Sequence, residues 1–497
     1  MKQILLLVTL LVLVGCGRTV TKPTPPAPPP PVGPPAPPPV SPPPPPVTLE
    51  PLKVSANGRF LETASGKPFF MVGDTNWALV GLQSREEVTA YFANRKAKGF
   101  NTVLTTAMIS IVQKNRFGVY PFEFLIPSAP TEQEKGYDFS RPIEAYWKHL
   151  DFVIAEASKA GVYVQLTVAW SNYLGGHNGQ RVPLAWDQTK ARNYGRFVGQ
   201  RYKDQAIIWV AGGDDRFDLP CGYPSGCSSG TERDAWWNAI VAGIQEHNPQ
   251  ALITFHPSGG LSSSDVVGDA PWLSFHSHQS GHIANDYNSL VPKDYARKVV
   301  KPVIDIEPLY EDNPFWDTIN GGWTNQRPDE AQVRRIHYWN ATSGATGTVF
   351  GNLAVAVYHM DPGDFYPGGP STIYPNGLNA PGSVQMGHLG KLMRSRPFHE
   401  GKPDTSLVMD GLGSDITTVT ALVAPSFAFI FVPNQRSVQV DLTNLGQSKA
   451  WWFNPATGVA QEIGNFSGQP TIPAASFGPD AVLVLDQISK GYGPPGQ

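Results

Sequence analysis

The chain has 497 residues, of which 41% are hydrophobic and 16% are charged, and its net charge is −3. This length allows two or three domains with sizeable cores. The small net charge gives no electrostatic reason to expect nucleic acid, or a broad attraction to acidic membranes, as a partner. The 13 Trp, 17 Tyr and 24 Phe residues suit packed cores and also permit sugar binding on flat aromatic faces.

The N-terminal segment predicts export. The apolar run over residues 4–14 is too short to cross a bilayer and is typical of the core of a signal peptide. It ends in Leu-Val-Gly before Cys16, which resembles the bacterial lipobox, so residues 1–15 are predicted to be a lipoprotein signal peptide and Cys16 the lipid attachment site. Gly17 stands where an Asp would favour the inner membrane, and this favours the outer membrane or cell surface. An ordinary cleaved signal peptide is the alternative.

A Pro-rich segment follows, with 17 Pro in residues 23–46. Residues 16–51 are therefore predicted to be the lipidated cysteine and a semi-rigid polyproline II spacer, on the order of 70 Å long. Two cysteines remain, Cys221 and Cys227, and in an oxidising compartment they are predicted to form a disulfide. A metal site is the weaker alternative for them, because no His lies nearby in the sequence.

Short apolar segments then alternate with helical segments as far as residue 398. Apolar runs without alternation are typical of strands that are buried on both faces. The strand candidates are residues 69–73, 102–105, 163–168, 207–210, 252–255, 272–275, 303–306 and 346–350. They predict an α/β fold, a (β/α)8 TIM barrel over residues 52–398. A doubly wound open sheet is the rival, but no Gly-x-Gly-x-x-Gly motif opens the first helix.

Helix signals separate many of these strands. Ser84 and Glu87 form a capping box, and Gly99 marks the end of that helix. Further helices are expected after Pro142, over residues 194–202, after Thr231, after Pro328 and over residues 384–395. Beyond these, turns separate strand candidates at residues 416–422, 427–432, 437–442, 450–454 and 481–486. This pattern predicts a small all-β sandwich over residues 399–490.

In a TIM barrel the catalytic groups lie where the strands end and their loops begin. Asp214 follows the fourth strand and Glu307 the seventh, so the two carboxyl groups would face each other across the barrel mouth. One could protonate a leaving oxygen while the other attacks the anomeric carbon of a sugar. Four alternatives stay open: Asp214 or Asp215 could cap a turn, Asp215 rather than Asp214 could be the acid/base, and Glu311 could be the nucleophile or an arginine partner.

Other residues at the strand ends are predicted to contact the substrate. They are Asp74, Trp77, Trp170, Asp215, Arg216, His256, His276, His278, Gln279, His282, Glu311 and Asn352. Asp74 would orient its neighbours or bind sugar hydroxyls, and Arg216 could instead pair with a carboxylate. Trp77 and Trp170 fit the core as well as they fit a sugar platform.

The histidines raise an alternative function. His276 and His278 would point to one side of a strand and could bind zinc together with His256, which would make the protein a metal-dependent hydrolase. Neutral histidines also bind sugar hydroxyls, and we expect neither a metal nor another cofactor. The absence of a Gly-x-Ser-x-Gly motif argues against an esterase. The third hypothesis is a non-catalytic surface lipoprotein that binds carbohydrate or matrix polymers.

These motifs together resemble the apiosidase-like family, which comprises glycoside hydrolase family 140 and its relatives. The resemblance rests on residues 57–60, 66–70, 73–77, 99–101, 209–214, 256–257, 279–282, 301–308, 310–311 and 351–352. It implies a (β/α)8 fold and a retaining mechanism, with Asp214 as acid/base and Glu307 as nucleophile. The segment 451–458 resembles the collagen-binding-type sandwich domain that often follows in the family, and its Trp451-Trp452 pair could pack against the barrel.

The predicted protein is thus an exported glycoside hydrolase, held at a membrane by lipid on Cys16. We expect its substrate to be a plant-type or other branched polysaccharide. We also expect it to act as a monomer and to bind no nucleic acid.

Overall fold

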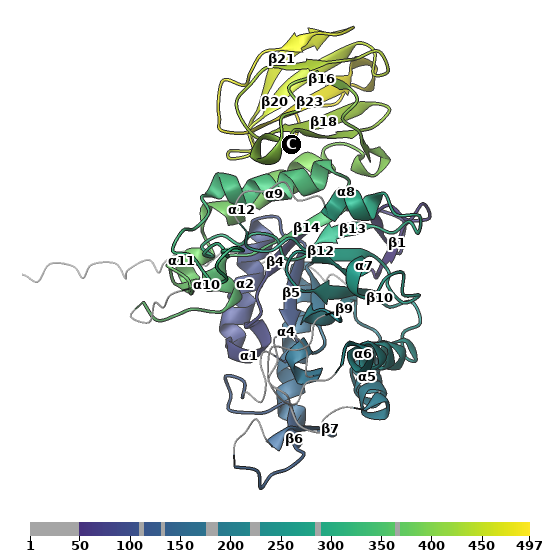
Figure 1. Ribbon diagram of the computed structural model, residues 1–497, viewed down its shortest axis with the longest axis vertical. Coiled ribbons are helices and arrows are strands. Elements are labelled where there is room, and N and C mark those ends of the chain that lie inside the picture. Colours follow the sequence, from purple (N-terminus) through teal and green to yellow (C-terminus); the bar gives the residue numbers. More distant parts are fainter. Residues whose placement is uncertain are drawn as a thin grey trace, which may run out of the picture. The chain divides into compact units, whose positions relative to one another are not determined.

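The computed structural model describes residues 49–108, 114–130, 135–174, 187–218, 229–283, 290–362 and 368–497 (Figure 1). The predicted signal peptide, Cys16, the Pro-rich segment and the pair Cys221 and Cys227 lie outside the described residues. Within them, no helix has both the length and the apolar character that crossing a membrane requires.

The predicted (β/α)8 barrel is confirmed. Among the described residues, its parallel strands are β4 (Met71–Thr75), β5 (Thr102–Thr106), β8 (Tyr163–Thr167), β9 (Ile207–Asp215), β10 (Leu252–Pro257), β12 (His276–Gln279), β13 (Val303–Asp305) and β14 (Gly347–Phe350). They are bonded in the order β10-β9-β8-β5-β4-β14-β13-β12, and β11 (Leu261–Ser262) adds an antiparallel edge to β12. The amide of Ser274 donates to the carbonyl of Ile253 at 2.8 Å, which brings the two ends of the sheet together and nearly closes the barrel.

The strands are buried on both faces, as the apolar runs predict. Ile208, Val210 and Ile304 belong to the cluster that fills the barrel interior, whereas Trp209 and Ile253 belong to the cluster between strands and helices. This double burial explains why seven of the eight predicted strands overlap observed ones.

The prediction of the sixth strand is wrong, because it places the strand at residues 272–275, four residues too early in the chain. The strand is instead the polar segment His276–Gln279, and of the predicted residues Phe275 fills the barrel interior. Among its four buried polar residues, Ser277 has hydrogen-bond partners on β10: its hydroxyl donates to the carbonyl of Phe255 and accepts from Thr254 at 2.9 Å. Hydrophobicity alone therefore misplaces this strand.

Helices cover the outside of the barrel. The longer ones are α2 (Arg85–Ala97), α4 (Glu144–Ala160), α5 (Gln188–Tyr202), α6 (Gly230–Gln245), α9 (Glu330–Thr342) and α12 (Pro381–Arg394). The shorter ones are α1 (Leu79–Leu82), α7 (Ser263–Val266), α8 (Leu290–Tyr295), α10 (Leu353–Ala356) and α11 (Tyr374–Gly377). The predicted capping box of Ser84 and Glu87 begins α2.

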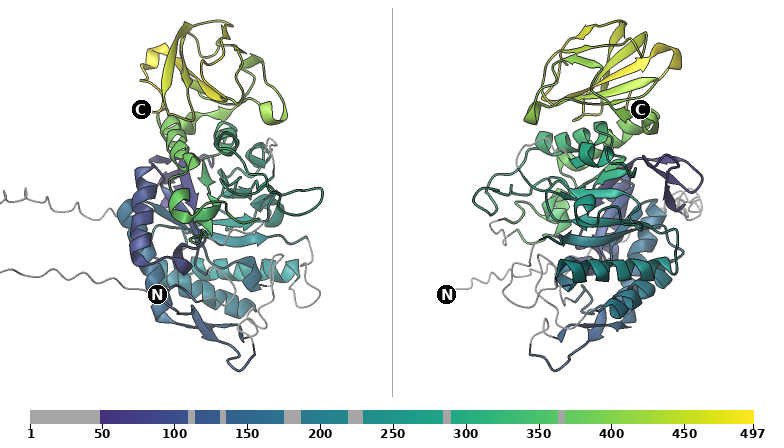
Figure 2. Two further views of the ribbon diagram at one scale, coloured as in Figure 1. Left: turned by 90° about the vertical axis from the view of Figure 1, so that its left-hand side faces the viewer. Right: turned by 45° about the vertical axis from the view of Figure 1, so that its right-hand side comes forward.

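Helices α5 and α6 lie side by side (Figure 2). A Cβ at Gly195 of α5 would lie only 2.0 Å from the carbonyl oxygen of Ile240 of α6, so the two helices can pack this closely only with glycine there.

Four further sheets lie among the residues that the structure describes. Before the barrel, β1 (Leu52–Val54), β2 (Leu61–Thr63) and β3 (Pro68–Phe69) form a meander, and β6 (Phe122–Phe124) pairs with β7 (Tyr137–Pro142). After it, one sheet contains β15 (Lys402–Pro403), β17 (Thr420–Val423), β18 (Phe427–Val432), β23 (Ala481–Gln487), β20 (Ser448–Phe453) and β21 (Ala460–Phe466). A second contains β16 (Val408–Asp410), β19 (Val438–Val440) and β22 (Thr471–Ile472). The C-terminal region is all-β, as predicted, but the sequence pattern missed the polar edge strand β21.

Buried ion pairs tie this β-region to the helical layer of the barrel, where α9 and α12 lie beneath it (Figure 1). Arg334 of α9 donates from Nε to Asp480 at 2.9 Å. Arg396, just after α12, makes a bidentate pair with Asp486 at 2.7 and 2.6 Å. Trp451 belongs to the apolar cluster that both regions share, so the β-region is packed firmly against the barrel.

Candidate active site

The end of β9 turns sharply at two glycines and aims Asp214 into the barrel mouth. Gly212, Gly213 and Asp214 all have positive φ, at 82°, 140° and 52°. A Cβ at Gly212 would lie 2.5 Å from the carbonyl oxygen of His256, so the close approach of β10 also requires glycine there. The irregularity shifts the pairing with β10, which is how a strand re-aims a side chain near a site.

Glu307 lies directly after β13, between two histidine rings. Its Oε2 is 2.8 Å from Nε2 of His256, and its Oε1 is 3.4 Å from Nε2 of His282. The other ring nitrogen of His282, Nδ1, accepts the amide of Tyr310 at 3.4 Å. Because that nitrogen accepts, the hydrogen of neutral His282 sits on Nε2 and faces Glu307.

His256 faces Glu307 with an N–H in either protonation state. When the ring is neutral, its Nδ1 can accept the amide of Asp214 at 3.3 Å; when it is charged, Nδ1 can donate to the carbonyl of Pro257 at 3.1 Å. Burial disfavours the charged ring, but the neighbouring Glu307 outweighs burial and raises the pKa of His256. Glu307 therefore has a hydrogen donor at each of its two oxygens.

The two carboxyl groups have opposite pKa shifts. Burial, together with the negative charge of Glu307, raises the pKa of Asp214 to about 6. Burial would raise the pKa of Glu307 as well, but the contacts with His256 and His282 outweigh it and lower that pKa to about 2. Between these values Asp214 holds a proton while Glu307 is charged, which is the division that an acid and a nucleophile need.

These groups are close enough to act on one atom. An oxygen of Asp214, a ring nitrogen of His256 and an oxygen of Glu307 all lie within 4.8 Å of one another. By spacing alone the same three donors could hold a metal ion. The predicted metal set of His256, His276 and His278 is not such a group among the described residues.

A cavity of about 630 Å³ opens over this pair, a volume typical of ligand pockets. Seven of the predicted site residues line it, namely Trp77, Trp170, Asp214, Arg216, Gln279, His282 and Glu307. The rings of Trp77 and Trp170 meet edge to face with centroids 4.9 Å apart, and both rings lie beside His256. The guanidinium of Arg216 pairs with Asp218 at 2.7 Å.

Two of the predicted acidic residues, on strands β4 and β9, bind side chains of the surrounding helices instead. Asp74 is fully buried, where the Tyr91 hydroxyl donates to it at 2.5 Å and the Arg95 guanidinium is 3.5 Å away. Asp215 is fully buried too, and it accepts from Arg233 at 3.1 Å and from the indole of Trp237 at 3.0 Å. Neither lines the cavity, so we withdraw their substrate contacts and the proposal that Asp215 replaces Asp214.

Five further residues predicted to contact the substrate also lie outside the cavity lining: His256, His276, His278, Glu311 and Asn352. His276 and His278 are completely buried, and His278 is 3.7 Å from Asp305. Glu311 accepts the amide of Gly382 at 3.0 Å and the side-chain amide of Asn352 at 3.4 Å. The contacts of Glu311 with Gly382 and Asn352 hold loops in position. We therefore withdraw the predicted substrate contacts of His276, His278, Glu311 and Asn352. His256 lies behind the cavity wall, where it contacts Glu307 rather than open space.

The family described as "Apiosidase-like, catalytic domain" matches residues 55–400. This chain belongs to the apiosidase-like family. Residues 402–486 match the family described as "Putative collagen-binding domain of a collagenase". A comparison with curated proteins found no match.

Two solved structures are similar to this apiosidase-like chain over most of its length. One is called a glycoside hydrolase; it is 28% identical, with a TM-score of 0.76 over 89% of this chain and 98% of its own. The other is a glycoside hydrolase family 5 protein from Bacteroides vulgatus; it is 28% identical, with a TM-score of 0.75 over 89% of this chain and 95% of its own. The chain is a glycoside hydrolase by family and by fold.

Several cavity residues of this apiosidase-like enzyme escaped the sequence analysis. They are chiefly Ser258, Tyr310, Asn313, Trp316, Thr318 and Trp323. The two Trp residues flank Gly321-Gly322 in the segment between the seventh strand and the helix after Pro328. Aromatic residues in a loop at the carboxyl end of a barrel strand are a signal for ligand contact that could have been used.

Proposed function

We propose that this enzyme cleaves a glycosidic bond with retention of anomeric configuration, with Glu307 as nucleophile and Asp214 as acid/base. The observation that carries the proposal is the meeting of two carboxyl groups with opposite pKa shifts in one cavity. Retaining enzymes hold their carboxyl groups about 5–5.5 Å apart, and inverting enzymes hold theirs about 6.5–9.5 Å apart. The approach of oxygens to within 4.8 Å supports the retaining arrangement.

In the first step, Glu307 attacks the anomeric carbon while Asp214 gives its proton to the leaving oxygen. The C–O bond to the leaving group breaks, and the sugar stays bound to Glu307 as an ester. In the second step, the ionised Asp214 takes a proton from water, and that water displaces Glu307 from the anomeric carbon. The N–H groups of His256 and His282 favour ionised Glu307, which suits both its attack and its departure.

The substrate class is part of the proposal. We propose a plant-type or other branched polysaccharide, because the family match supports a sugar substrate and the cavity combines aromatic faces with hydrogen-bonding side chains. The test is a hydrolysis screen over plant and bacterial polysaccharides, in which proton NMR follows the first product anomer. Inverted product would overturn the mechanism, and no turnover of any glycoside would overturn the activity.

Two variants test the roles directly on whichever glycoside the screen identifies. Glu307→Ala should lose turnover, and added azide should restore it by giving a glycosyl azide of inverted configuration. Asp214→Ala should keep turnover of a substrate with a good leaving group, and azide should then give the azide of retained configuration. Glu311→Gln is the matched comparison, because it tests the alternative nucleophile, and it should support turnover without azide.

Export and lipid anchoring remain proposals from the sequence. The lipobox-like segment before Cys16 supports them. Cys16→Ser should abolish labelling of the expressed protein by a radioactive fatty acid in a diderm bacterial host and should release the protein from the membrane fraction. Equal labelling of the variant and the parent would contradict the proposal.

A further inference from the structure

A β-hairpin after β13 forms one side of the cavity. The amide of Thr324 donates to the carbonyl of Phe315 at 2.8 Å, and the amide of Phe315 donates to the carbonyl of Gln326 at 3.0 Å. The amide of Trp316 donates to the carbonyl of His282 at 2.7 Å, which ties the hairpin to the segment that carries this histidine. Backbone pairing therefore fixes the hairpin beside Glu307 and its histidine partner.

Two Trp rings on this hairpin line the cavity and remain partly open to solvent. Trp316 is 40% exposed and Trp323 is 47% exposed, and their rings meet edge to face with centroids 5.1 Å apart. Trp323 lies 5.9 Å from the ring of His282, which in turn contacts Glu307. We call Trp316 and Trp323 the aromatic wall. Only the ring of His282 separates this wall from Glu307, the proposed nucleophile. Neighbouring aromatic rings that stay exposed at the edge of a cavity are typical of a binding surface.

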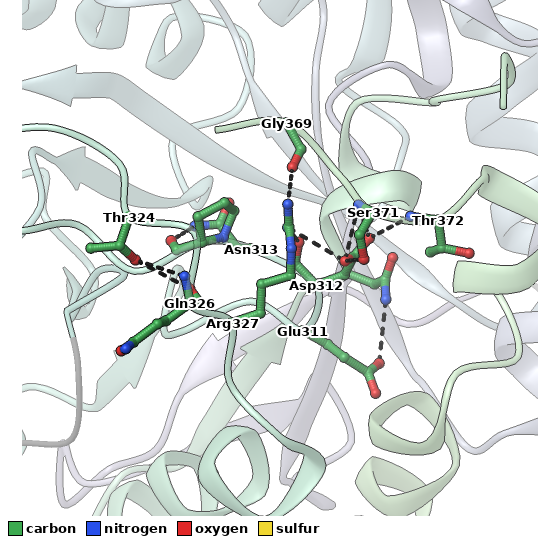
Figure 3. A network of polar contacts seen from close by, with 11 residues as sticks. Glu311, Asp312, Asn313, Thr324, Gln326, Arg327, Gly369, Ser371 and Thr372 are labelled. Carbon is green, nitrogen blue, oxygen red and sulfur yellow. Dashed lines mark hydrogen bonds and ion pairs between the residues drawn. The ribbon is translucent and has the colours of Figure 1, made fainter. Parts of the chain in front are cut away.

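A polar clamp holds both ends of the hairpin (Figure 3). The carboxylate of Asp312, just before the hairpin, accepts the amides of Ser371 and Thr372 at 2.9 and 3.1 Å. Arg327, just after it, donates to the carbonyls of Asp312 and Gly369, the latter at 2.7 Å. The two side chains also form an ion pair at 3.4 Å. Because neither Asp312 nor Arg327 lines the cavity, the clamp can only position the wall.

The segment held by this clamp also supports the wall from behind. A Cβ at Gly368 would lie 3.0 Å from Cδ1 of Trp323, so this backbone packs directly against the indole ring. The wall is thus preorganised, and less side-chain entropy is lost when a ligand binds to it.

We propose that Trp316 and Trp323 form a second sugar subsite. Their rings stack on the sugar that is joined, through the bond to be cleaved, to the sugar that Glu307 attacks. This inference rests on the proposed glycosidase function and names its substrate class: glycans of at least two sugar units. Trp77 and Trp170 flank His256 and also line the cavity, so they can supply aromatic contacts to the sugar that Glu307 attacks. Asn313 and Thr318 also line the cavity from the hairpin segment and suit the hydroxyl groups of a sugar.

The first test measures binding without turnover. The Glu307→Gln protein is applied to an array of immobilised plant and bacterial oligosaccharides, graded in length from single sugars upward. We expect binding only from two units upward, with dissociation constants about tenfold weaker, roughly 1.4 kcal/mol, in Trp316→Ala and Trp323→Ala. Ile319→Ala is the matched control, because this residue is 91% exposed at the hairpin tip and lies outside the cavity lining. Equal binding of single sugars, unchanged binding by the Trp variants, or no binding at all would overturn the subsite.

The second test separates the subsite from the chemistry. It compares kcat/KM on an oligosaccharide with kcat/KM on the fluoride of the same terminal sugar, which has no second ring. The ratio of the two should fall about tenfold in each Trp variant, and by less in Asp312→Asn, which weakens the clamp alone. An unchanged ratio in the Trp variants would overturn the subsite. If the wild type hydrolyses neither compound while the array result holds, the proposed function fails and the subsite stands.

Discussion

Nε2 of His256 lies 2.8 Å from Oε2 of Glu307, while the opposite nitrogen of the same ring lies 3.3 Å from the amide of Asp214. One imidazole therefore contacts both halves of the proposed catalytic pair. It does so through the carboxylate of the nucleophile and through the backbone of the acid. This relationship suggests that the protonation of the pair and the position of the pair depend on the same side chain.

The pH dependence of kcat/KM follows from the two carboxyl groups. Asp214 must be protonated to give its proton, so kcat/KM should fall as the pH rises through about 6. Glu307 must be charged to attack, so the acid limb should appear only as the pH falls toward about 2. Profiles measured on the wild type and on Asp214→Asn, with a good leaving group, check this assignment. The alkaline limb should vanish in the variant, and its persistence would assign that limb to another group.

His256→Ala should change the acid limb of the pH profile of kcat/KM more than the alkaline limb. Without His256 the burial of Glu307 is less opposed, so its pKa should rise and the acid limb should move to higher pH. We expect kcat to fall by roughly 10- to 100-fold, as happens when a group that orients a reacting carboxylate is lost. His282→Ala should have a smaller effect, because its contact with Glu307 is longer, at 3.4 Å. A lower kcat with an unmoved acid limb would point to a purely structural role.

Sequence could predict the barrel because most of its strands are continuous apolar runs, but it could not place His276–Gln279. Those four residues are polar although they are buried, so no apolar run marks the strand. The choice between Asp214 and Asp215 was equally out of reach. Neighbouring residues of a strand point to opposite faces, and the positive φ angles of Gly212 and Gly213 shift that alternation locally. Most strands can be located from sequence, whereas the direction of each side chain at a strand end depends on such local backbone geometry.

The backbone geometry at Gly213 gives a third prediction. Gly213→Ala would place a Cβ 2.8 Å from Cδ2 of Trp170, at a φ of 140° that L side chains rarely adopt. The clash should displace Trp170 and the adjoining Asp214, so kcat should fall by about 100-fold while the protein still folds. Gly66→Ala is the control, because Gly66 also has a positive φ but would meet no atom within 4 Å, and it lies between β2 and β3, outside the cavity lining. It should lose a little stability and no activity. Equal loss of kcat in both variants would show that strain alone, rather than the contact with Trp170, is responsible.

The buried pair of Arg396 and Asp486 predicts how the β-region unfolds. Both side chains are almost completely inaccessible, at 2% and 3% exposure, so Arg396→Met would leave the Asp486 charge buried without its bidentate partner. Breaking such a pair costs about 3–5 kcal/mol, whereas replacing both partners by apolar residues is often close to neutral. Calorimetry should therefore show a lower Tm for Arg396→Met and partial recovery in the double variant with Asp486→Leu. Because the apolar cluster around Trp451 is shared between the barrel and the β-region, the wild type should melt in a single transition. Two separate transitions in the wild type would mean that the shared cluster and the ion pairs do not couple the two regions.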